Sequence, residues 1–540
     1  MAIVPSYNQM FVGKRFLVID DFRDMRGMLR EMLKAFGAKD IDMAANGKEA
    51  ISLIEQNKYS AVLCDFNLGF GKNGQEILET VKYRDLIGLS TAWVIVTAEK
   101  TSDMVVGAAE FMPDDYIVKP VNEDILRSRV EKVMSKKIAL VEIEKAIRMK
   151  DLGRAIDLCD EALATNKTIA AELLRIKTNL LFKIGNYGQV KQIFEKILAT
   201  RDIPWVRTGL AKVAFYSGDM ETARRLLQEV LKENHAYLEA HDWLGKIYEQ
   251  QGELDEAQRI LVRSTTLSPN SYVRQRSLGE VAHKRGDIKS AEIAYRKSIK
   301  LGENSFLKNA APHLGLAKIC TAHDNPGEAL QILKNVHKEF PDQETNLHAK
   351  VLEGLVYQKS GDKDNADKIA KEIAEITQRE KNNLPAELMV DATELLLETG
   401  KKEAAENLAL TIVKNDHENQ ELLARMNELY SQAGMVEEGQ QLVEKARQEV
   451  IEANNQGVTL AKEGMLDEAI ELLRNARKML PNSKRILINL ANVAMLSMQK
   501  NGKSEALVLE IREYMERVAT LGGEEKWCAQ MQSALNTLPK

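Results

Sequence analysis

Glycine recurs at a nearly constant interval over positions 150–464 of this 540-residue sequence, and no other feature restricts the fold as strongly. The shortest interval runs from Gly434 to Gly464 and the longest from Gly361 to Gly400, and eight of the ten positions are glycine. The ten positions are Lys150, Gly185, Gly218, Gly252, Gly286, Asp324, Gly361, Gly400, Gly434 and Gly464. Five positions after each of them stands a second column of nearly always small residues, and three of the intervals contain a late proline, Pro269, Pro341 or Pro481.

Each of these columns has a physical role in a pair of helices joined by a turn. Glycine adopts the left-handed backbone that ends a first helix, alanine lets a second helix pack closely, and proline stops that helix. A fixed period of about 34 residues indicates stacked helical repeats, in which each unit buries its apolar face against the next.

The residues of these columns resemble tetratricopeptide repeats, best in the stretch WLGKIYEQQGELDEAQRILVRSTTLSP at residues 243–269. The resemblance implies an all-α solenoid of about ten repeats over residues 137–500, followed by C-terminal capping helices over 501–540. The longer steps predict inserted residues near 302–313 and 380–387.

Residues 1–136 follow a different pattern. Short apolar runs, FLVID, IDMAA, AVLCDF, AWVIVT and YIVKP, alternate with amphipathic segments of helical period. This alternation predicts an α/β domain with a five-stranded parallel sheet, helices on both faces, and a ligand site at the carboxyl ends of the strands.

Polar side chains stand where these predicted strands end. Asp20 and Asp21 follow the first strand, Asp65 ends the third, Thr97 and Ala98 end the fourth, and Lys119 follows the fifth. Three carboxylates at one edge of a sheet require neutralisation, and Mg²⁺ supplies it with oxygen ligands. A hydroxyl and an ammonium group beside them suit an incoming phosphoryl group.

This set of residues resembles the receiver domain of two-component response regulators, over residues 13–136 of a first domain at 1–136, and implies a flavodoxin-like fold. The resemblance implies that Asp65 is the phosphoacceptor and that Mg²⁺ is bound by Asp20, Asp21, Asp65 and the Asn67 carbonyl. It also implies that the phosphoryl group is held by Thr97, Ala98 and Lys119, and that Tyr116 is the switch aromatic. By the same resemblance, Asn67 and Glu99 tune dephosphorylation. One departure is that Gly74 stands nine residues after Asp65, so that the intervening loop is one residue longer than usual. Without Asp65, Thr97 and Lys119, the Asp20–Asp21 pair would indicate no more than a turn or a helix cap.

The repeats contain no catalytic motif, and all eight histidines lie there without metal-ligand spacing. We therefore expect the array to bind another protein through inward-facing positions of its first helices. Candidates for that partner surface are Trp205, Lys212, Asp242, Lys246, Arg276 and Glu280. Packing between repeats is an equally good explanation of Trp205.

Composition excludes several classes of partner and compartment. The 75 basic and 80 acidic residues give a net charge of −5, so no nucleic-acid binding is expected. No apolar stretch reaches the roughly 20 residues of a membrane span. Four scattered cysteines indicate neither disulfides nor zinc, and we expect a cytoplasmic protein with reduced thiols.

The sequence as a whole predicts a response regulator of a two-component phosphorelay. A histidine kinase or phosphotransfer protein would phosphorylate Asp65, and the repeats would act through an unidentified protein partner. Beyond the receiver's own phosphorylation and dephosphorylation, no enzyme activity is expected. The alternative is a phosphatase-like or phosphate-sink regulator of another phosphorelay. The sequence is also compatible with a homodimer formed through the receiver. Because no Gly or Pro separates residues 122–137 from 138–150, little or no linker, or even one continuous helix, is expected there.

Overall fold

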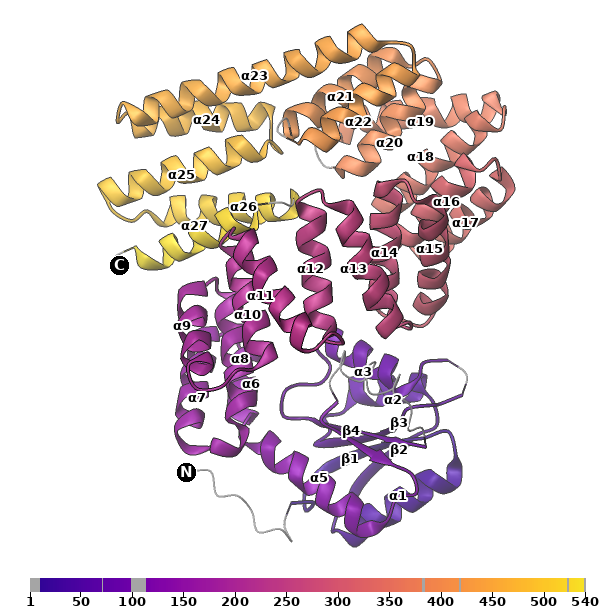
Figure 1. Ribbon diagram of the computed structural model, residues 1–540, viewed down its shortest axis with the longest axis vertical. Helices are drawn as coiled ribbons and strands as arrows, with labels where there is room; N and C mark the ends of the chain where they lie inside the picture. Colours follow the sequence, from indigo (N-terminus) through magenta and orange to yellow (C-terminus); the bar gives the residue numbers. More distant parts are fainter. Residues whose placement is uncertain are drawn as a thin grey trace. The chain divides into compact units, whose positions relative to one another are not determined.

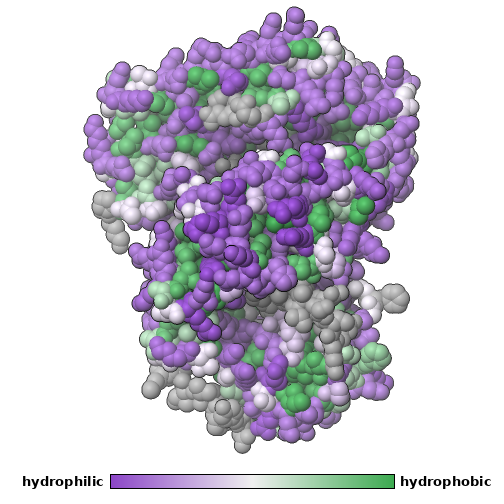
Figure 2. Space-filling model, in the orientation of Figure 1, coloured by the Kyte–Doolittle hydropathy of each residue, from purple (hydrophilic) through white to green (hydrophobic). Residues whose placement is uncertain are grey.

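The computed structural model describes residues 10–69, 71–98, 113–380, 384–416, 419–521 and 524–538. The chain forms two compact units. The first comprises Met1–Val213 and Met220–Lys308, and the second comprises Ala214–Asp219 and Asn309–Lys540. Hydrophilic side chains dominate the face shown in Figure 2, as expected for a chain that is 29% charged.

A five-stranded parallel sheet forms the centre of the N-terminal domain, and this confirms the predicted α/β fold (Figure 1). The strand order is β2-β1-β3-β4-β5. The strands are β1 (Arg15–Ile19), β2 (Asp40–Ala44), β3 (Ala61–Asp65), β4 (Ala92–Thr97) and β5 (Asp115–Val118). Every residue of β3 and β4 is buried, because these central strands are covered on both faces.

Helices cover both faces of this sheet. They are α1 (Arg23–Ala35), α2 (Gly47–Gln56), α3 (Gly74–Tyr83) and α5 (Glu123–Ile138). Successive strand residues point to opposite faces, so Phe16 and Val18 share a core with α1 and α5, while Leu17 and Ile19 share another with α2 and α3. The helix expected between β4 and β5 lies in residues 99–112, outside the described residues.

Ten α-helices follow as far as residue 302, and they pack in consecutive pairs such as α12 with α13 and α14 with α15. They are α6 (Val141–Arg148), α7 (Leu152–Thr165), α8 (Ala170–Lys183), α9 (Tyr187–Leu198), α10 (Pro204–Tyr216), α11 (Met220–Glu233), α12 (Leu238–Gln250), α13 (Leu254–Leu267), α14 (Tyr272–Arg285) and α15 (Ile288–Gly302), with a short 3-10 turn η2 (Lys167–Ile169) before α8.

The helical pairing continues through the second unit. Its helices are α16 (Ala311–Ala322), α17 (Pro326–Glu339), α18 (Gln343–Lys359), α19 (Lys363–Glu380), α20 (Ala386–Glu398), α21 (Lys402–Asn415), α22 (Gln420–Gln432), α23 (Val436–Lys462), α24 (Leu466–Met479), α25 (Lys484–Asn501), α26 (Glu505–Leu521) and α27 (Glu525–Thr537). The predicted boundary at residue 500 falls at the end of α25, which packs against α26 and shares a core with α24 and α27. Within the described parts of the chain, no helix has the length and apolarity needed to cross a membrane.

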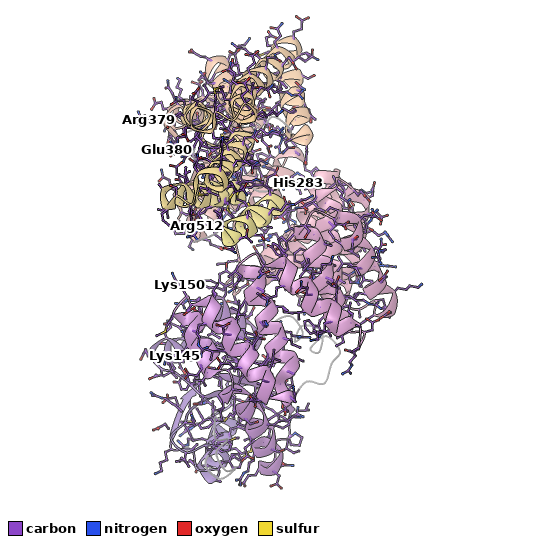
Figure 3. The ribbon with its side chains drawn as sticks, turned by 90° about the vertical axis from the view of Figure 1, so that its left-hand side faces the viewer. Lys145, Lys150, His283, Arg379, Glu380 and Arg512 are labelled. Atoms are coloured by element: carbon purple, nitrogen blue, oxygen red, sulfur yellow. The ribbon has the colours of Figure 1, made fainter. Side chains whose placement is uncertain are left out.

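All ten turn positions predicted from the glycine column have left-handed backbone. The eight glycines have φ between 70° and 86°. Lys150 (labelled in Figure 3) and Asp324 adopt the same conformation with φ of 59° and 56°, although a side chain is strained there. The position alone, rather than the residue at it, therefore determines the turn.

The shortest interval in the column explains the longest helix. Gly434 and Gly464 bound that interval, and α23 fills nearly all of it as one unbroken helix. The turn that separates other repeats is missing here, so the second helix of one repeat continues as the first helix of the next (Figure 1).

The receiver and the first repeat are joined by a tight turn, and the expected continuous helix is not formed. Helix α5 ends at Ile138, residues 139 and 140 make a turn, and α6 begins at Val141. Leu140 is fully buried in the core of the first repeats, and the chain bends to place it there. The predicted absence of a flexible linker is confirmed, since only two residues separate the helices.

Candidate functional site

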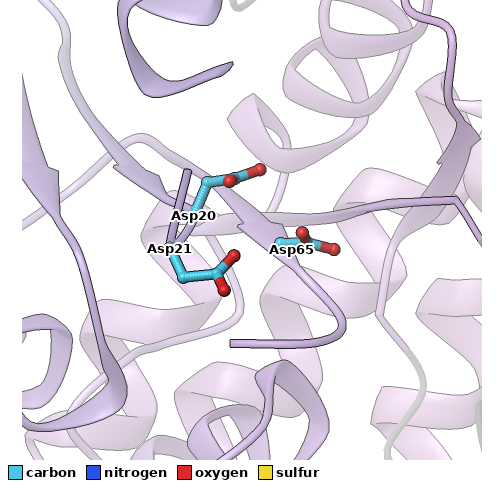
Figure 4. Close-up of side chains that lie close together, drawn as sticks. All are labelled: Asp20, Asp21 and Asp65. Atoms are coloured by element: carbon cyan, nitrogen blue, oxygen red, sulfur yellow. The ribbon is translucent and has the colours of Figure 1, made fainter. Parts of the chain in front are cut away.

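The strand ends bring three carboxylates together at one edge of the sheet (Figure 4). Asp20 directly follows β1, Asp65 is the last residue of the adjacent β3, and Asp21 lies on the turn into α1. An oxygen from each of the three lies within 4.8 Å of the others. Because parallel neighbouring strands end side by side, this convergence is a direct result of the topology.

Lys119 links two of these carboxylates from the end of β5. Its Nζ lies 2.9 Å from an oxygen of Asp20 and 2.7 Å from an oxygen of Asp65. Asp20 is fully buried and Asp65 is 6% exposed, whereas Asp21 faces solvent. One ammonium group thus faces three carboxylates, and the excess negative charge suits a divalent cation with oxygen ligands.

Burial and charge act in opposite directions on these groups. Burial raises the pKa of Asp65 above its ordinary value, and the nearby Lys119 reduces that rise without cancelling it. Burial alone would lower the pKa of Lys119, but its hydrogen bonds to Asp65 and Asp20 raise it. Lys119 therefore stays charged at neutral pH and supplies a fixed positive charge beside Asp65.

Arg26 of α1 also contributes to this site, although no pattern in the sequence predicts it. Its guanidinium donates hydrogen bonds to the backbone carbonyls of Asp20 (2.6 Å) and Asp21 (3.0 Å), and the Phe22 amide donates to the Asp20 carboxylate (2.9 Å). These bonds hold the turn after β1 in shape. The only signal in the sequence is a basic residue in the first turns of a helix, a few positions after an acidic pair, and this arrangement is common.

The loop after Asp65 approaches the acceptor closely as it enters α3. The Gly74 amide donates to the Phe66 carbonyl (2.8 Å), while Asn73 and Glu76 form a reciprocal cap on α3. The Asn67 amide lies 3.4 Å from the Asp65 carboxylate, and its side chain is exposed. A Cβ at Gly74 would lie 2.2 Å from the Asp65 carbonyl oxygen, so only glycine fits there.

We expect Gly74→Ala to destabilise the receiver by about 1–3 kcal/mol, because the methyl group must push the acceptor strand and α3 apart. Phosphoryl uptake should slow as well. Gly27→Ala is the matched control, since a Cβ there meets no atom within 4 Å. Urea unfolding of the two variants measures the difference, and equal midpoints would show that the close approach is not required.

The remaining predicted receiver residues are placed as follows. Thr97, the last residue of β4, is 3% exposed and lies next to Val118 of β5, and Ala98 after it is exposed. Tyr116 is half-buried in β5, against the core that includes α2 and α3. Glu99 lies outside the described residues.

Internal contacts engage the candidate partner surface on α10. Trp205 packs edge-to-face on Phe194 at 5.6 Å between ring centres, and Arg175 lies over its ring. Packing between repeats therefore accounts for Trp205. Lys212 pairs with Glu239 and lies 5.4 Å from the ring centre of Trp243.

The candidates on α12 and α14 are also paired. Asp242 accepts two hydrogen bonds of 2.7 Å from Arg274 of the following repeat, and Lys246 lies over the Trp243 ring. Arg276 and Glu280 pair with each other at 3.4 Å. Register alone predicted that these residues face inward, but it did not reveal these partners.

Comparison with known proteins identifies both parts of the chain. Residues 16–131 match the response regulator receiver domain model, and residues 214–278 match a tetratricopeptide repeat model. The chain is 25% identical over 122 residues to the chemotaxis protein CheY of Pseudomonas aeruginosa, covering 23% of this chain and 97% of that protein. It is 24% identical over 122 residues to CheY-3 of Vibrio cholerae, covering 23% of this chain and 92% of that protein.

Solved structures match the same part of the chain. The response regulator TrrA of Thermotoga maritima, in complex with Mg(2+)-BeF, is 29% identical, with a TM-score of 0.20, over 22% of this chain and 98% of that chain. A CheY-like receiver domain protein of Methanospirillum hungatei is 26% identical, with a TM-score of 0.21, over 23% and 95%. The family models, together with the folds described above, establish that this chain joins a response regulator receiver domain to tetratricopeptide repeats.

Proposed function

We propose that this chain works in a two-component phosphorelay, that Asp65 accepts a phosphoryl group from a histidine kinase or phosphotransfer protein, and that the repeats transmit the resulting state to a protein partner. The observation that carries the proposal is the position of Lys119, which contacts both Asp20 and Asp65 beside the third carboxylate. Three carboxylates thus lie beside one ammonium group. Here the surplus acids lie at the strand ends, where α/β sheets bind their ligands.

In the proposed reaction an Asp65 carboxylate oxygen attacks the phosphorus of the donor. A bond forms between that oxygen and phosphorus while the bond from phosphorus to the donor nitrogen breaks, and the donor leaves with the electron pair. Asp20, Asp21, Asp65 and the Asn67 carbonyl would hold Mg²⁺, which neutralises the charge that accumulates at the oxygens. Lys119 is 2.7 Å from Asp65 before transfer and is placed to bind an oxygen of the new phosphoryl group.

The repeats contribute by binding rather than by catalysis, and the chain has no enzyme activity beyond the reactions of its own receiver. Supporting this, the inward-facing charges of α12 and α14 are engaged in ion pairs such as Asp242–Arg274 and Arg276–Glu280. These ion pairs hold the side chains in fixed positions within and between neighbouring repeats. Tetratricopeptide stacks present extended surfaces of this kind to other proteins.

Labelling by a small donor tests the proposal directly. We expect the full chain to gain one phosphoryl group from acetyl phosphate in the presence of Mg²⁺, and to gain none after chelation with EDTA, because three carboxylates would then repel the donor. Intact mass measurement follows the product. Asp21→Asn should raise the Mg²⁺ concentration required, whereas Asp24→Asn, an exposed acid on the first turn of α1, should not. Labelling of the wild type at an equal rate without Mg²⁺ would contradict the assignment.

A further inference from the structure

The residues inserted between α15 and α16 contact the receiver. This loop covers residues 303–310, and its residues 304–308 contact α3 and the residues just before it, all within the first compact unit. We call residues 304–308 the clasp. The long step in the repeat period predicts an insertion near residues 302–313 but indicates no contact with the receiver.

A buried carboxylate is the centre of this contact. Glu79 of α3 is 7% exposed, and one of its oxygens accepts a hydrogen bond of 2.5 Å from the Ser305 hydroxyl, which is itself 6% exposed. The same oxygen accepts from the Leu307 amide at 3.3 Å. Burying a carboxylate costs free energy unless donors replace the water it loses, and here the clasp supplies two of those donors.

An aromatic pair extends the contact along the same helix. The rings of Tyr83 and Phe306 lie 5.1 Å apart and are tilted by 51°. Both residues are still partly exposed, Tyr83 at 66% and Phe306 at 41%. Such a pair adds a modest attraction. Because both rings are partly exposed, a substitution at either residue removes the pair without creating a cavity in a hydrophobic core.

The clasp also contacts the chain that leads from the acceptor into α3. The Asn304 side-chain amide donates to the Gly71 carbonyl at 3.4 Å, and the Lys72 ammonium donates to the Asn304 carbonyl. Gly71 and Lys72 lie between Asp65 and Gly74, in the segment that also contains the proposed metal-binding carbonyl of Asn67.

We propose that the clasp positions Gly71, Lys72 and α3, which follow the acceptor in the chain, and so makes phosphoryl chemistry at Asp65 depend on the state of the repeat array. The proposal rests on the proposed function for its chemical consequence, but not for the contact itself. The clasp contacts both ends of the short region 71–83. It contacts Gly71 and Lys72 at the start of this region, and Glu79 and Tyr83 on α3. Because coupling free energies are reciprocal, a partner that draws the clasp off α3 would change phosphorylation, and phosphorylation would change the affinity for that partner.

Hydrogen exchange on the full chain without a phosphoryl donor tests the contact. In the double variant Ser305→Ala, Phe306→Ala we expect the amides of residues 71–83 to exchange about fivefold faster, the factor that corresponds to losing about 1 kcal/mol of hydrogen bonding. Exchange in α1 should not change. Ser360→Ala, which removes a hydroxyl from another turn between helices, is the matched control. Unchanged exchange of residues 71–83 in the double variant would overturn the proposal.

Phosphorylation by acetyl phosphate with saturating Mg²⁺ tests the consequence. We expect the double variant to take up phosphoryl groups at a rate different from wild type, with Ser360→Ala unchanged, because the contacts of Ser305 and Phe306 with Glu79 and Tyr83 of α3 are then lost. Equal rates alongside faster exchange would show that the clasp has no role in positioning and would reject the proposal. If the wild type itself takes up no phosphoryl group, the proposed function fails, and the exchange result still decides whether the clasp restrains this segment.

Discussion

Asp65→Asn should abolish phosphoryl uptake from acetyl phosphate and, at the same time, make the receiver more stable at neutral pH. The amide is not a nucleophile, so labelling is lost. Burial raises the pKa of the native carboxyl, and a group whose pKa is higher in the folded state contributes stability only at low pH and loses it as the pH rises through that value. At pH 7 the ionised Asp65 therefore costs stability, and removing its charge relieves repulsion from Asp20 and Asp21.

These two effects together distinguish a chemical defect from a folding defect. Intact mass gives labelling, and hydrogen exchange of the amides of β4, in which Trp93 is buried, measured at increasing urea concentration, gives the stability of the receiver. Asp24→Asn serves as the control, since it removes an exposed carboxylate from the start of α1. Undiminished labelling of Asp65→Asn would show that another residue accepts the phosphoryl group. A lower urea midpoint for Asp65→Asn than for the wild type would show that the attraction between Lys119 and the Asp65 carboxylate exceeds the free-energy cost of burying that carboxylate.

Asp391→Ala should destabilise the second unit by about 3–5 kcal/mol, the cost of removing one partner from a buried ion pair. Asp391, on α20, is 2% exposed in its side chain. Its oxygens lie 2.6 Å from Nζ of Lys318, 2.7 Å from Nε2 of His348 and 3.1 Å from the guanidinium of Arg425. These partners come from α16, α18 and α22, so the substitution removes the buried carboxylate that links four helices and leaves Glu387 as the remaining acidic partner of Lys318.

The same residue should make the second unit sensitive to acid. Burial alone would raise the pKa of Asp391, but Lys318 and the hydrogen bond from His348 outweigh it and lower the pKa to about 2. A carboxyl with a lowered pKa contributes stability above its unfolded pKa of about 4, and loses it as the pH falls through its lower folded value. Hydrogen exchange of α20 between pH 7 and pH 3 measures this. Asp364→Ala, which removes an exposed acid from α19, is the control, and equal acid sensitivity of all three proteins would contradict the prediction.

Local patterns in the sequence were sufficient to predict the strand ends and the turns. Asp20, Asp65 and Lys119 each follow an apolar run, and a parallel sheet brings such positions to one edge without further information. The ten turn positions follow from spacing, and even Lys150 and Asp324 obey it. Both predictions succeed because each depends on residues close together in the chain.

Features that depend on distant residues could not be predicted in this way. The break between α5 and α6 arises because Leu140 is buried in the core of the repeats. Register put Asp242 on the predicted partner surface, but it does not indicate that Arg274, 32 residues away, is its partner. Ser305 and Glu79 are 226 residues apart, and nothing in either local sequence indicates the other.

The continuous helix α23 has a consequence for how the second unit unfolds. In a stack of separate repeats each unit contacts its neighbours through an interface, and melting can stop at any interface along the stack. Helix α23 belongs to two repeats at once, packing on α22 near its start and on α24 and α25 further along. Continuous helical backbone, rather than a turn, joins those two repeats. Denaturation that begins at the C-terminal helices therefore cannot pause between α22 and α24, and this part of the stack should melt as a single cooperative block twice the usual size.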